Sequence, residues 1–331
     1  MTRPALDAPA GDSAIQYSLK ALQASGTPGV ARARRALVHL LAPQSSSAWP
    51  EVSWRFSRLT GDGYPFELTC CTVPHTRYTL EVGPPELPDH QRLPLALSLL
   101  RAAGERADVQ SSDGRSAAAL TELQQGRPLR YGAWLSGRHT NTADSYKAYA
   151  EVPVGASWAA AAPLLGALPF GSHCGMVGLA SDGSQELYFR VPALTWEDLE
   201  LLCGRHGLQR HLPALTSLLL LLSGRTVLPP TPTGLSVTFH SGRLQSIALI
   251  VAVRDLIGGD GAAQTVLARF FPPQSGYARV SQTLAGRAGP LTHHSALSFA
   301  LTAAGLQGVS VGLRPSLPEH PLPLGKLERC A

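Results

Sequence analysis

Charged residues are scarce in this sequence of 331 residues, because Asp, Glu, Lys and Arg together make up only 15% of it. The formal net charge is +5, and the densest basic cluster is short, with Arg34 next to Arg35 and Arg32 nearby. A protein that binds nucleic acid normally carries a denser basic stripe. We therefore expect no nucleic-acid partner.

Long apolar segments are absent as well. The N-terminus begins with polar and small residues and lacks the apolar core of a signal peptide. The most hydrophobic stretch, residues 218–222 with its flanks, is about ten residues long, whereas a bilayer-spanning helix needs about twenty. We interpret it as a buried helix and expect a cytoplasmic protein with no membrane partner.

Cysteine is rare, and its arrangement excludes two further classes. The five cysteines are odd in number and form no Cys-x-x-Cys pair, which favours a reducing compartment over a disulfide framework or a structural zinc site. The sequence also contains no Asp-Asp-x-x-Asp cluster that would bind magnesium. We expect no metal and no other cofactor, and the sequence predicts no particular oligomeric state.

What the sequence does contain is a unit of two strand-like segments followed by one or two helix-like segments, repeated five times. The short links within each pair make the paired strands antiparallel, and Gly or Pro bounds nearly all of them. The predicted strand pairs are residues 66–72 with 77–82, 131–138 with 146–152, 175–180 with 186–191, 235–240 with 244–253, and 294–301 with 308–313. The predicted helices are 13–25, 29–42, 93–105, 116–125, 157–168, one starting after Thr195, 262–271 and 277–284.

Five hairpins predict an α+β fold in which a ten-stranded antiparallel barrel is surrounded by helices, since closure leaves no exposed strand edge. We expect one domain over residues 1–331, with flexible tails at 1–12 and 316–331. Helices outside the barrel require an apolar outer wall, so that alternate strand residues face a lumen.

Lysine is the scarcest charged residue, and one of the three lysines lies in a predicted strand. Alternation with a period of two places Lys147 and Tyr149 on one face of that strand and Ala148 and Ala150 on the other. If the alanines pack on helices, Lys147 points into the lumen, where an unpaired ammonium is costly. We therefore expect an anion beside it.

The same face of an earlier strand carries a second cation. Arg77 shares its face with Glu81, as Lys147 shares its face with Glu151. Aligning the two glutamates superposes Arg77 on Lys147 within the repeat. We expect both cations at one level of the lumen.

This layout resembles the ABBA-type aromatic prenyltransferases, or PT barrels, and specifically their dimethylallyltryptophan-synthase-like branch. The resemblance covers about residues 52–315 and rests on three stretches, residues 62–68, 77–81 and 146–149. It implies a metal-independent transferase of secondary metabolism. Such an enzyme moves an allylic prenyl group, for example dimethylallyl, from its diphosphate to an electron-rich aromatic acceptor such as an indole.

The resemblance also implies roles for individual residues. Glu67 matches the acid that takes the acceptor's proton, and Arg77 matches an arginine that contacts the diphosphate. Lys147 and Tyr149 match a Lys-x-Tyr pair that binds diphosphate and shields the allyl cation. Tyr188 keeps a further shielding aromatic position.

Other positions depart from the family pattern. Glu186 stands where relatives carry a basic residue, and Ala248 and Gly312 stand where shielding tyrosines are expected. Three arginines further along the same repeats are candidates for additional basic contacts: Arg190, Arg254 and Arg314.

Each of these residues also has an ordinary structural reading. Glu67 and Arg77 are compatible with a plain ion pair, Tyr188 with core packing, and the three candidate arginines with snorkelling to solvent. Two alternatives to prenyl transfer therefore stay open. One is a PT-barrel enzyme with a different reaction, such as a cyclase or isomerase, and the other is a non-catalytic barrel that binds a small molecule.

Overall fold

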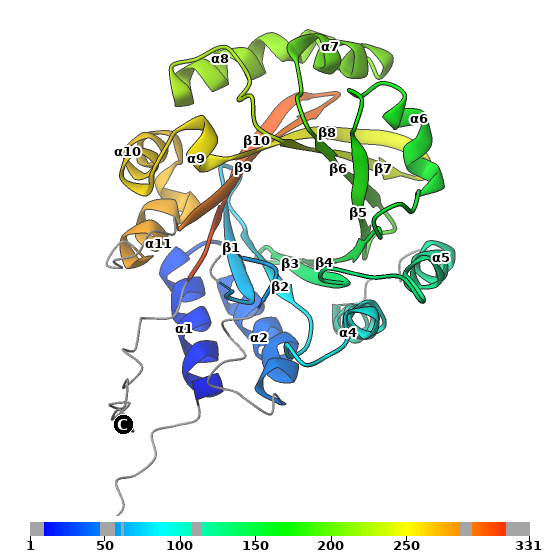
Figure 1. Ribbon diagram of the computed structural model, residues 1–331. Coiled ribbons are helices and arrows are strands. Elements are labelled where there is room, and N and C mark those ends of the chain that lie inside the picture. Colours follow the sequence, from blue (N-terminus) through cyan, green and yellow to red (C-terminus); the bar gives the residue numbers. More distant parts are fainter. Residues whose placement is uncertain (1–9, 47–56, 61–62, 108–113, 285–292, 316–331) are drawn as a thin grey trace, which may run out of the picture.

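The computed structural model describes residues 10–46, 57–60, 63–107, 114–284 and 293–315. Its centre is a closed antiparallel barrel in which the strands follow the order β1-β10-β9-β8-β7-β6-β5-β4-β3-β2. Figure 1 looks along this barrel and shows the helices on the outside of the ring of strands. The predicted ten-stranded barrel of five hairpins is thus confirmed.

The ten strands agree with the predicted segments to within about three residues at most ends, the usual uncertainty of a boundary. They are β1 (Phe66–Cys71), β2 (Thr76–Glu81), β3 (Ala133–His139), β4 (Asp144–Glu151), β5 (His173–Ala180), β6 (Gln185–Val191), β7 (Thr233–His240), β8 (Arg243–Ala252), β9 (His294–Thr302) and β10 (Gly305–Leu313).

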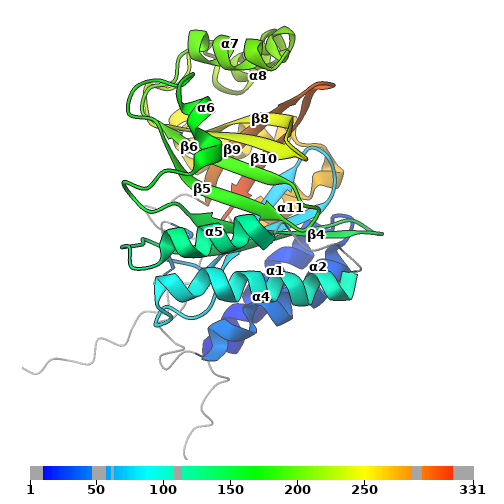
Figure 2. The same ribbon diagram turned by 90° about the vertical axis from the view of Figure 1, so that its right-hand side faces the viewer.

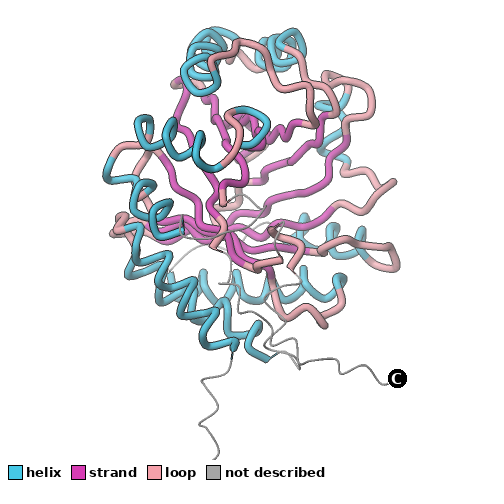
Figure 3. The backbone as a smooth tube through the Cα atoms, turned by 60° about the vertical axis from the view of Figure 1, so that its left-hand side comes forward, coloured by secondary structure: helices cyan, strands magenta, loops and turns pink. Residues whose placement is uncertain are grey.

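Helices cover the outer wall, as the tube in Figure 3 shows. The α-helices are α1 (Ala10–Ser25), α2 (Val30–Leu41), α4 (Asp89–Ala107), α5 (Gly114–Gln124), α6 (Ala162–Leu165), α7 (Trp196–Arg205), α8 (Leu212–Ser223), α9 (Val253–Leu256), α10 (Asp260–Phe270) and α11 (Tyr277–Leu284). Short 3-10 turns are η1 (Ala42–Ser46), η2 (Ala159–Ala161), η3 (Gln209–His211) and η4 (Pro273–Ser275).

The main core lies between the barrel wall and these helices. Ala148 and Ala150 of β4 are fully buried on the outer face, where α4 packs against the strand. Figure 2 shows α4 and α5 side by side along this wall. Small side chains let a helix approach the sheet closely, and the opposite face of β4 is left for Lys147 and Tyr149. The alternation predicted for this strand is therefore confirmed.

Three boundaries differ from prediction for physical reasons. The segment 157–168 holds only η2 and the four-residue α6, because Pro163 suits only a first helical turn and Gly166 follows directly as the end of α6. Strand β8 ends at Ala252, and Val253 already begins α9. Helix α1 begins at Ala10, so the last three residues of the predicted tail 1–12 are helical, while 1–9 and 316–331 lie outside the described residues.

The barrel closes through pairing of its first strand with its last, with Leu68 opposite Leu313. Helices from the two ends of the chain also meet, since Nε of Arg279 on α11 donates to the carbonyl oxygen of Ala24 on α1 at 3.2 Å. Within the described ranges, no helix combines the length and apolar character needed to cross a bilayer.

Candidate active site in the barrel lumen

The barrel encloses a cavity of about 1020 Å³ lined by residues from all ten strands. It extends from Leu59 and Trp134 to the hairpin end, which we define as the end of the barrel that carries the turns 72–75, 140–143, 181–184, 241–242 and 303–304. Val73 in the first turn lines the cavity and is 55% exposed. The lumen therefore opens to solvent at the hairpin end.

The four residues that the resemblance implies as contacts of the prenyl diphosphate or of the allyl cation all lie in this cavity. Arg77, Lys147, Tyr149 and Tyr188 line this cavity, and so does Glu67. They reach it from β1, β2, β4 and β6 because each occupies an inward position of its strand.

Lys147 already has an anionic partner within the protein. Its Nζ forms an ion pair with Oε2 of Glu186, which lies two strands away on β6. The lysine side chain crosses β5 at Gly178, where a Cβ would lie 2.9 Å from Cδ of Lys147. A side chain at this position would block the route, so the glycine is what permits the pair.

Glu186 is ionised despite its burial. Burial raises the pKa of its carboxyl, but the charge and hydrogen bond of Lys147, with hydrogen bonds from Ser236 and Tyr188, outweigh it and lower the pKa to about 2. Glu186 thus supplies the anion that we expected a ligand to supply. The expected anion beside Lys147 exists, but it belongs to the chain.

Two tyrosines lie directly beside this pair. The rings of Tyr149 and Tyr188 meet edge to face, with centroids 5.7 Å apart, and Nζ of Lys147 lies 5.8 Å from the Tyr149 centroid. The Tyr149 hydroxyl accepts from Ser136 Oγ at 3.1 Å and, at 3.5 Å, from Arg77 Nη2. Burial opposes ionisation of Tyr149, but Lys147 and Arg77 overcome it and lower the pKa of the phenol.

Glu67 lies against the last strand. It lines the cavity from β1, and a Cβ at Gly312 on β10 would approach its Oε1 to 2.5 Å. Thr69, two residues further along the same face of β1, pairs directly with Gly312. The missing side chain at position 312 therefore leaves room for the glutamate carboxylate, and a tyrosine there is incompatible with the position that Glu67 takes.

Arg138 is a lumen cation that we did not single out from the sequence. It lines the cavity from β3 and lies directly opposite Arg77 in the β2–β3 pairing. The available signal was the same period of two, since Trp134, Ser136 and Arg138 alternate along β3. In the next pairing Lys147 is opposite Ser136 and Arg138 is opposite Ser145, so that Arg138 and Lys147 are two residues apart along the β3–β4 ladder.

The three candidate arginines do not join the others. None of Arg190, Arg254 and Arg314 lines the cavity. The side chain of Arg254 is 75% exposed on α9, where its Nε pairs with Asp255 at 3.4 Å. The expectation that Arg254 continues strand β8 is wrong, because the strand ends two residues earlier.

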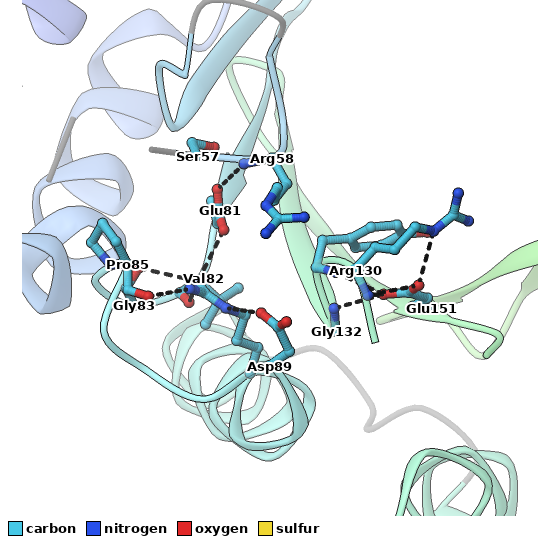
Figure 4. Close-up of polar contacts among 12 residues, drawn as sticks. Ser57, Arg58, Glu81, Val82, Gly83, Pro85, Asp89, Arg130, Gly132 and Glu151 are labelled. Carbon is cyan, nitrogen blue, oxygen red and sulfur yellow. Dashed lines mark hydrogen bonds and ion pairs between the residues drawn. The ribbon is translucent and has the colours of Figure 1, made fainter. Parts of the chain in front are cut away.

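The two aligned glutamates lie at the ends of β2 and β4 away from the hairpin end, and Figure 4 shows their polar contacts. Glu151 accepts backbone hydrogen bonds from Arg130, Tyr131 and Gly132 at 2.8 to 3.0 Å. Glu81 accepts from the backbone N–H of Arg58 at 2.9 Å.

Glu81 has a buried cation beside it as well. Its Oε1 pairs with Nη1 of Arg92 at 3.1 Å, and both side chains are almost fully buried. Burial raises the pKa of Glu81, and Arg92 opposes the rise. Like Glu151, this residue fixes the loop before its strand pair and does not line the cavity.

The cavity wall has two unlike parts. The charged arc consists of the inward residues Glu67, Arg77, Arg138, Lys147, Tyr149, Glu186 and Tyr188 of β1 to β6. The small-residue arc consists of the inward residues Ser236, Thr238, Ser246, Ala248, Ala296, Ser298, Ala300, Ser310 and Gly312 of β7 to β10. In the described part of the chain, no group of three or more His, Cys, Asp or Glu side chains is placed to hold a metal ion.

A closed ring of ten antiparallel strands with helices outside and a polar lumen is the PT-barrel fold, and this chain has it. The structure resembles 5-dimethylallyltryptophan synthase from Streptomyces coelicolor in complex with DMASPP and Trp, with a TM-score of 0.71, 18% identity, and coverage of 93% of this chain and 95% of that one. It also resembles 6-dimethylallyltryptophan synthase from Micromonospora olivasterospora in complex with DMASPP and Trp, with a TM-score of 0.70, 18% identity, and coverage of 92% and 97%.

A third similar structure is the prenyltransferase PriB in its apo form, with a TM-score of 0.71, 15% identity, and coverage of 94% of this chain and 98% of that one. No protein-family model and no curated protein sequence matches the chain. At these identities the likeness establishes the fold and leaves the reaction to be argued from the site.

Proposed function

We propose that this protein is an aromatic prenyltransferase that joins an allylic group to an electron-rich aromatic acceptor of the indole or tryptophan type inside the barrel, without a metal. The observation that supports this most is the charged arc, which gathers cations, two tyrosines in edge-to-face contact and carboxylates around one cavity. Two of the similar structures are complexes with DMASPP and Trp, which agrees with the substrate class.

The proposed reaction is an electrophilic substitution. The allylic C–O bond breaks, and the diphosphate leaves with the electron pair, stabilised by Arg77 and by Lys147 from within its ion pair. The faces of Tyr149 and Tyr188 stabilise the allyl cation. An aromatic carbon of the acceptor then forms the new C–C bond, and Glu67 takes the proton that the acceptor gives up.

One observation favours a second candidate, a PT-barrel enzyme with a different reaction or a barrel that only binds a small molecule. Lys147 is already neutralised by Glu186, and the tyrosine positions of the fourth and fifth repeats hold Ala248 and Gly312. A site of this kind has fewer groups to hold and shield a diphosphate and its cation.

The test is incubation of the purified protein with dimethylallyl or geranyl diphosphate and a panel of indoles, flavonoids and peptides, followed by mass spectrometry. We expect an acceptor mass increased by one prenyl group and release of diphosphate. No product with any acceptor, together with no heat on titrating dimethylallyl diphosphate in a calorimeter, would favour the second candidate. An apolar metabolite that co-purifies with the protein would favour the binding role.

A further inference from the structure

Two arginines of the lumen lie directly side by side. Arg77 on β2 and Arg138 on β3 are paired across the ladder, and both line the cavity near the hairpin end. Side chains directly opposite each other in an antiparallel pair start about 5 Å apart, and like charges at such positions are destabilising. A ligand that binds both groups removes this repulsion.

No carboxylate of the described residues contacts either arginine, although the charge of Glu186 favours the ionised form of both from a longer distance. Neither Arg77 nor Arg138 has an Asp or Glu oxygen within 4.0 Å, although the ion pairs of other arginines are present. The hydrogen bond that Arg77 makes goes to the hydroxyl of Tyr149, at 3.5 Å. Glu186 is directed to Lys147.

The surroundings of the two arginines differ. Burial lowers the pKa of Arg77, but Tyr149, Cys71, Tyr188 and Glu186 outweigh it and raise that pKa, whereas His75 and Arg138 respond mainly to burial and to positive charge. Burial, and then the charges of Arg138 and Arg77, lower the pKa of His75 to about 4. Burial and Arg77 likewise lower the pKa of Arg138, although this residue is still exposed to solvent at the open hairpin end. His75 lines the cavity, and its Nε2 is buried without a hydrogen-bond partner. A polar atom without a partner beside two cations without a counterion indicates an anion site.

We propose that Arg77 and Arg138, with His75 beside them, form the diphosphate site of this barrel, in place of the ion pair of Lys147 with Glu186. Two planar guanidinium groups side by side match the two phosphoryl groups of a diphosphate, each of which accepts bidentate hydrogen bonds. The identity of the diphosphate as that of the allylic co-substrate rests on the proposed function. The anion site itself does not.

This placement explains how the barrel tolerates Glu186. A diphosphate held by Lys147 would contact the Glu186 carboxylate that Lys147 already binds, whereas Arg77 and Arg138 have no carboxylate of the described residues within 4.0 Å. Arg77 also contacts the Tyr149 hydroxyl, so an allylic chain that extends inward from the diphosphate reaches the edge-to-face pair of Tyr149 and Tyr188.

The test is calorimetric titration of inorganic pyrophosphate into the purified full-length protein at low ionic strength. We expect Arg138→Gln and Arg77→Gln each to weaken binding at least tenfold. The control is Arg225→Gln, which removes the same charge from an exposed loop outside the cavity and should change the dissociation constant less than twofold. The neutral double variant Lys147→Met, Glu186→Gln should weaken binding less than threefold.

Thermal unfolding separates a binding defect from a folding defect. Without ligand, Arg138→Gln should melt at or above the temperature of the unsubstituted protein, because it removes the repulsion, while pyrophosphate should no longer raise its melting temperature. Unchanged pyrophosphate binding in Arg138→Gln, no binding to the unsubstituted protein, or loss of binding only in the double variant would each overturn the proposal.

The experiments also distinguish a failure of the anion-site proposal from a failure of the proposed transferase function. Pyrophosphate binding that depends on Arg138, in a protein that forms no prenylated product, supports the anion site and refutes the transferase. Prenyl transfer by Arg138→Gln with unchanged kcat/KM and unchanged pyrophosphate affinity refutes the anion site and leaves the transferase standing.

Discussion

The two arcs of the lumen differ in both charge and size. Every cavity-lining Arg, Lys and Glu of the described strands belongs to β1 through β6, whereas β7 to β10 contribute mainly hydroxyl, methyl and hydrogen side chains. We expect the charged arc to bind the diphosphate and stabilise the charges of the reaction, and the small-residue arc to determine which acceptor fits in the cavity. Substitutions on the charged arc should therefore lower activity strongly, and substitutions on the small-residue arc should lower it little.

Arg77→Ala should give the largest loss. The guanidinium of Arg77 is part of the proposed anion site and also contacts the Tyr149 hydroxyl. We therefore expect kcat/KM for prenyl transfer to fall by about 10² to 10³. Steady-state kinetics with dimethylallyl diphosphate measure the effect, and the exposed Arg225→Ala is the control. A loss of less than threefold would mean that the charged arc does not bind the diphosphate through Arg77.

The ion pair of Lys147 with Glu186 should make the stability of the fold depend on pH in the acidic range. The pKa of Glu186 is about 2, against an ordinary 4.5, so its ionised form stabilises the fold fully above about pH 4.5, and this stabilisation is lost as the pH falls toward 2. It amounts to at most about 3 kcal/mol.

Urea unfolding of the unsubstituted protein and of Glu186→Gln at several pH values measures this contribution. The difference in free energy of unfolding should be constant above pH 4.5 and shrink below it. A difference that does not depend on pH would show that Glu186 is not held ionised by Lys147.

Removing one member of that pair should harm activity more than removing both. Lys147→Met leaves the Glu186 carboxylate unpaired in the lumen, where it repels a diphosphate, and we expect kcat/KM to fall about thirtyfold. Lys147→Met combined with Glu186→Gln should recover part of the loss, to about fivefold. A double variant no better than the single one would show that Lys147 acts on the substrate independently of Glu186.

Gly178 and Gly175 allow a matched test on one strand. A Cβ at Gly178 would lie 2.9 Å from Lys147 Cδ, whereas a Cβ at Gly175 has no neighbour nearer than 3.9 Å. Gly178→Ala should displace the lysine and lower kcat/KM about tenfold, and Gly175→Ala should leave it within twofold. Equal effects would mean that the route across β5 is not limiting.

The smallest effects compare the same substitution on the two arcs. Ser136→Ala removes the hydroxyl that donates to Tyr149 at 3.1 Å and should lower kcat/KM about fivefold. Ser298→Ala on the small-residue arc should change it less than twofold. A larger effect at Ser298 would break the comparison, because it would place a specific polar contact on the small-residue arc.

The local part of this architecture was predictable from the sequence. Alternation with a period of two is a property of each strand alone, so the inward placement of Lys147 and Tyr149 followed from residues 146–152, and so did the apolar wall behind them. The hairpins were predictable for the same reason, since short turns leave no other pairing.

Contacts that cross strands were not predictable in this way. The ion pair of Lys147 depends on Gly178 on β5 and Glu186 on β6. Arg138 became a candidate only because the structure pairs it with Arg77. The end of β8 was missed because the apolar run 247–253 continues unchanged from the strand into α9. Periodicity cannot detect a change of secondary structure inside such a run.

The pairing of β1 with β10 has a kinetic consequence. The ladder that joins Leu68 to Leu313 links segments from nearly opposite ends of the described chain, so it forms only after the other strands are in place. Contacts so distant in sequence slow folding, and until they form, the sheet is open along both β1 and β10. Free edges of this kind are where chains associate wrongly, so the last step of folding is also the step most exposed to aggregation.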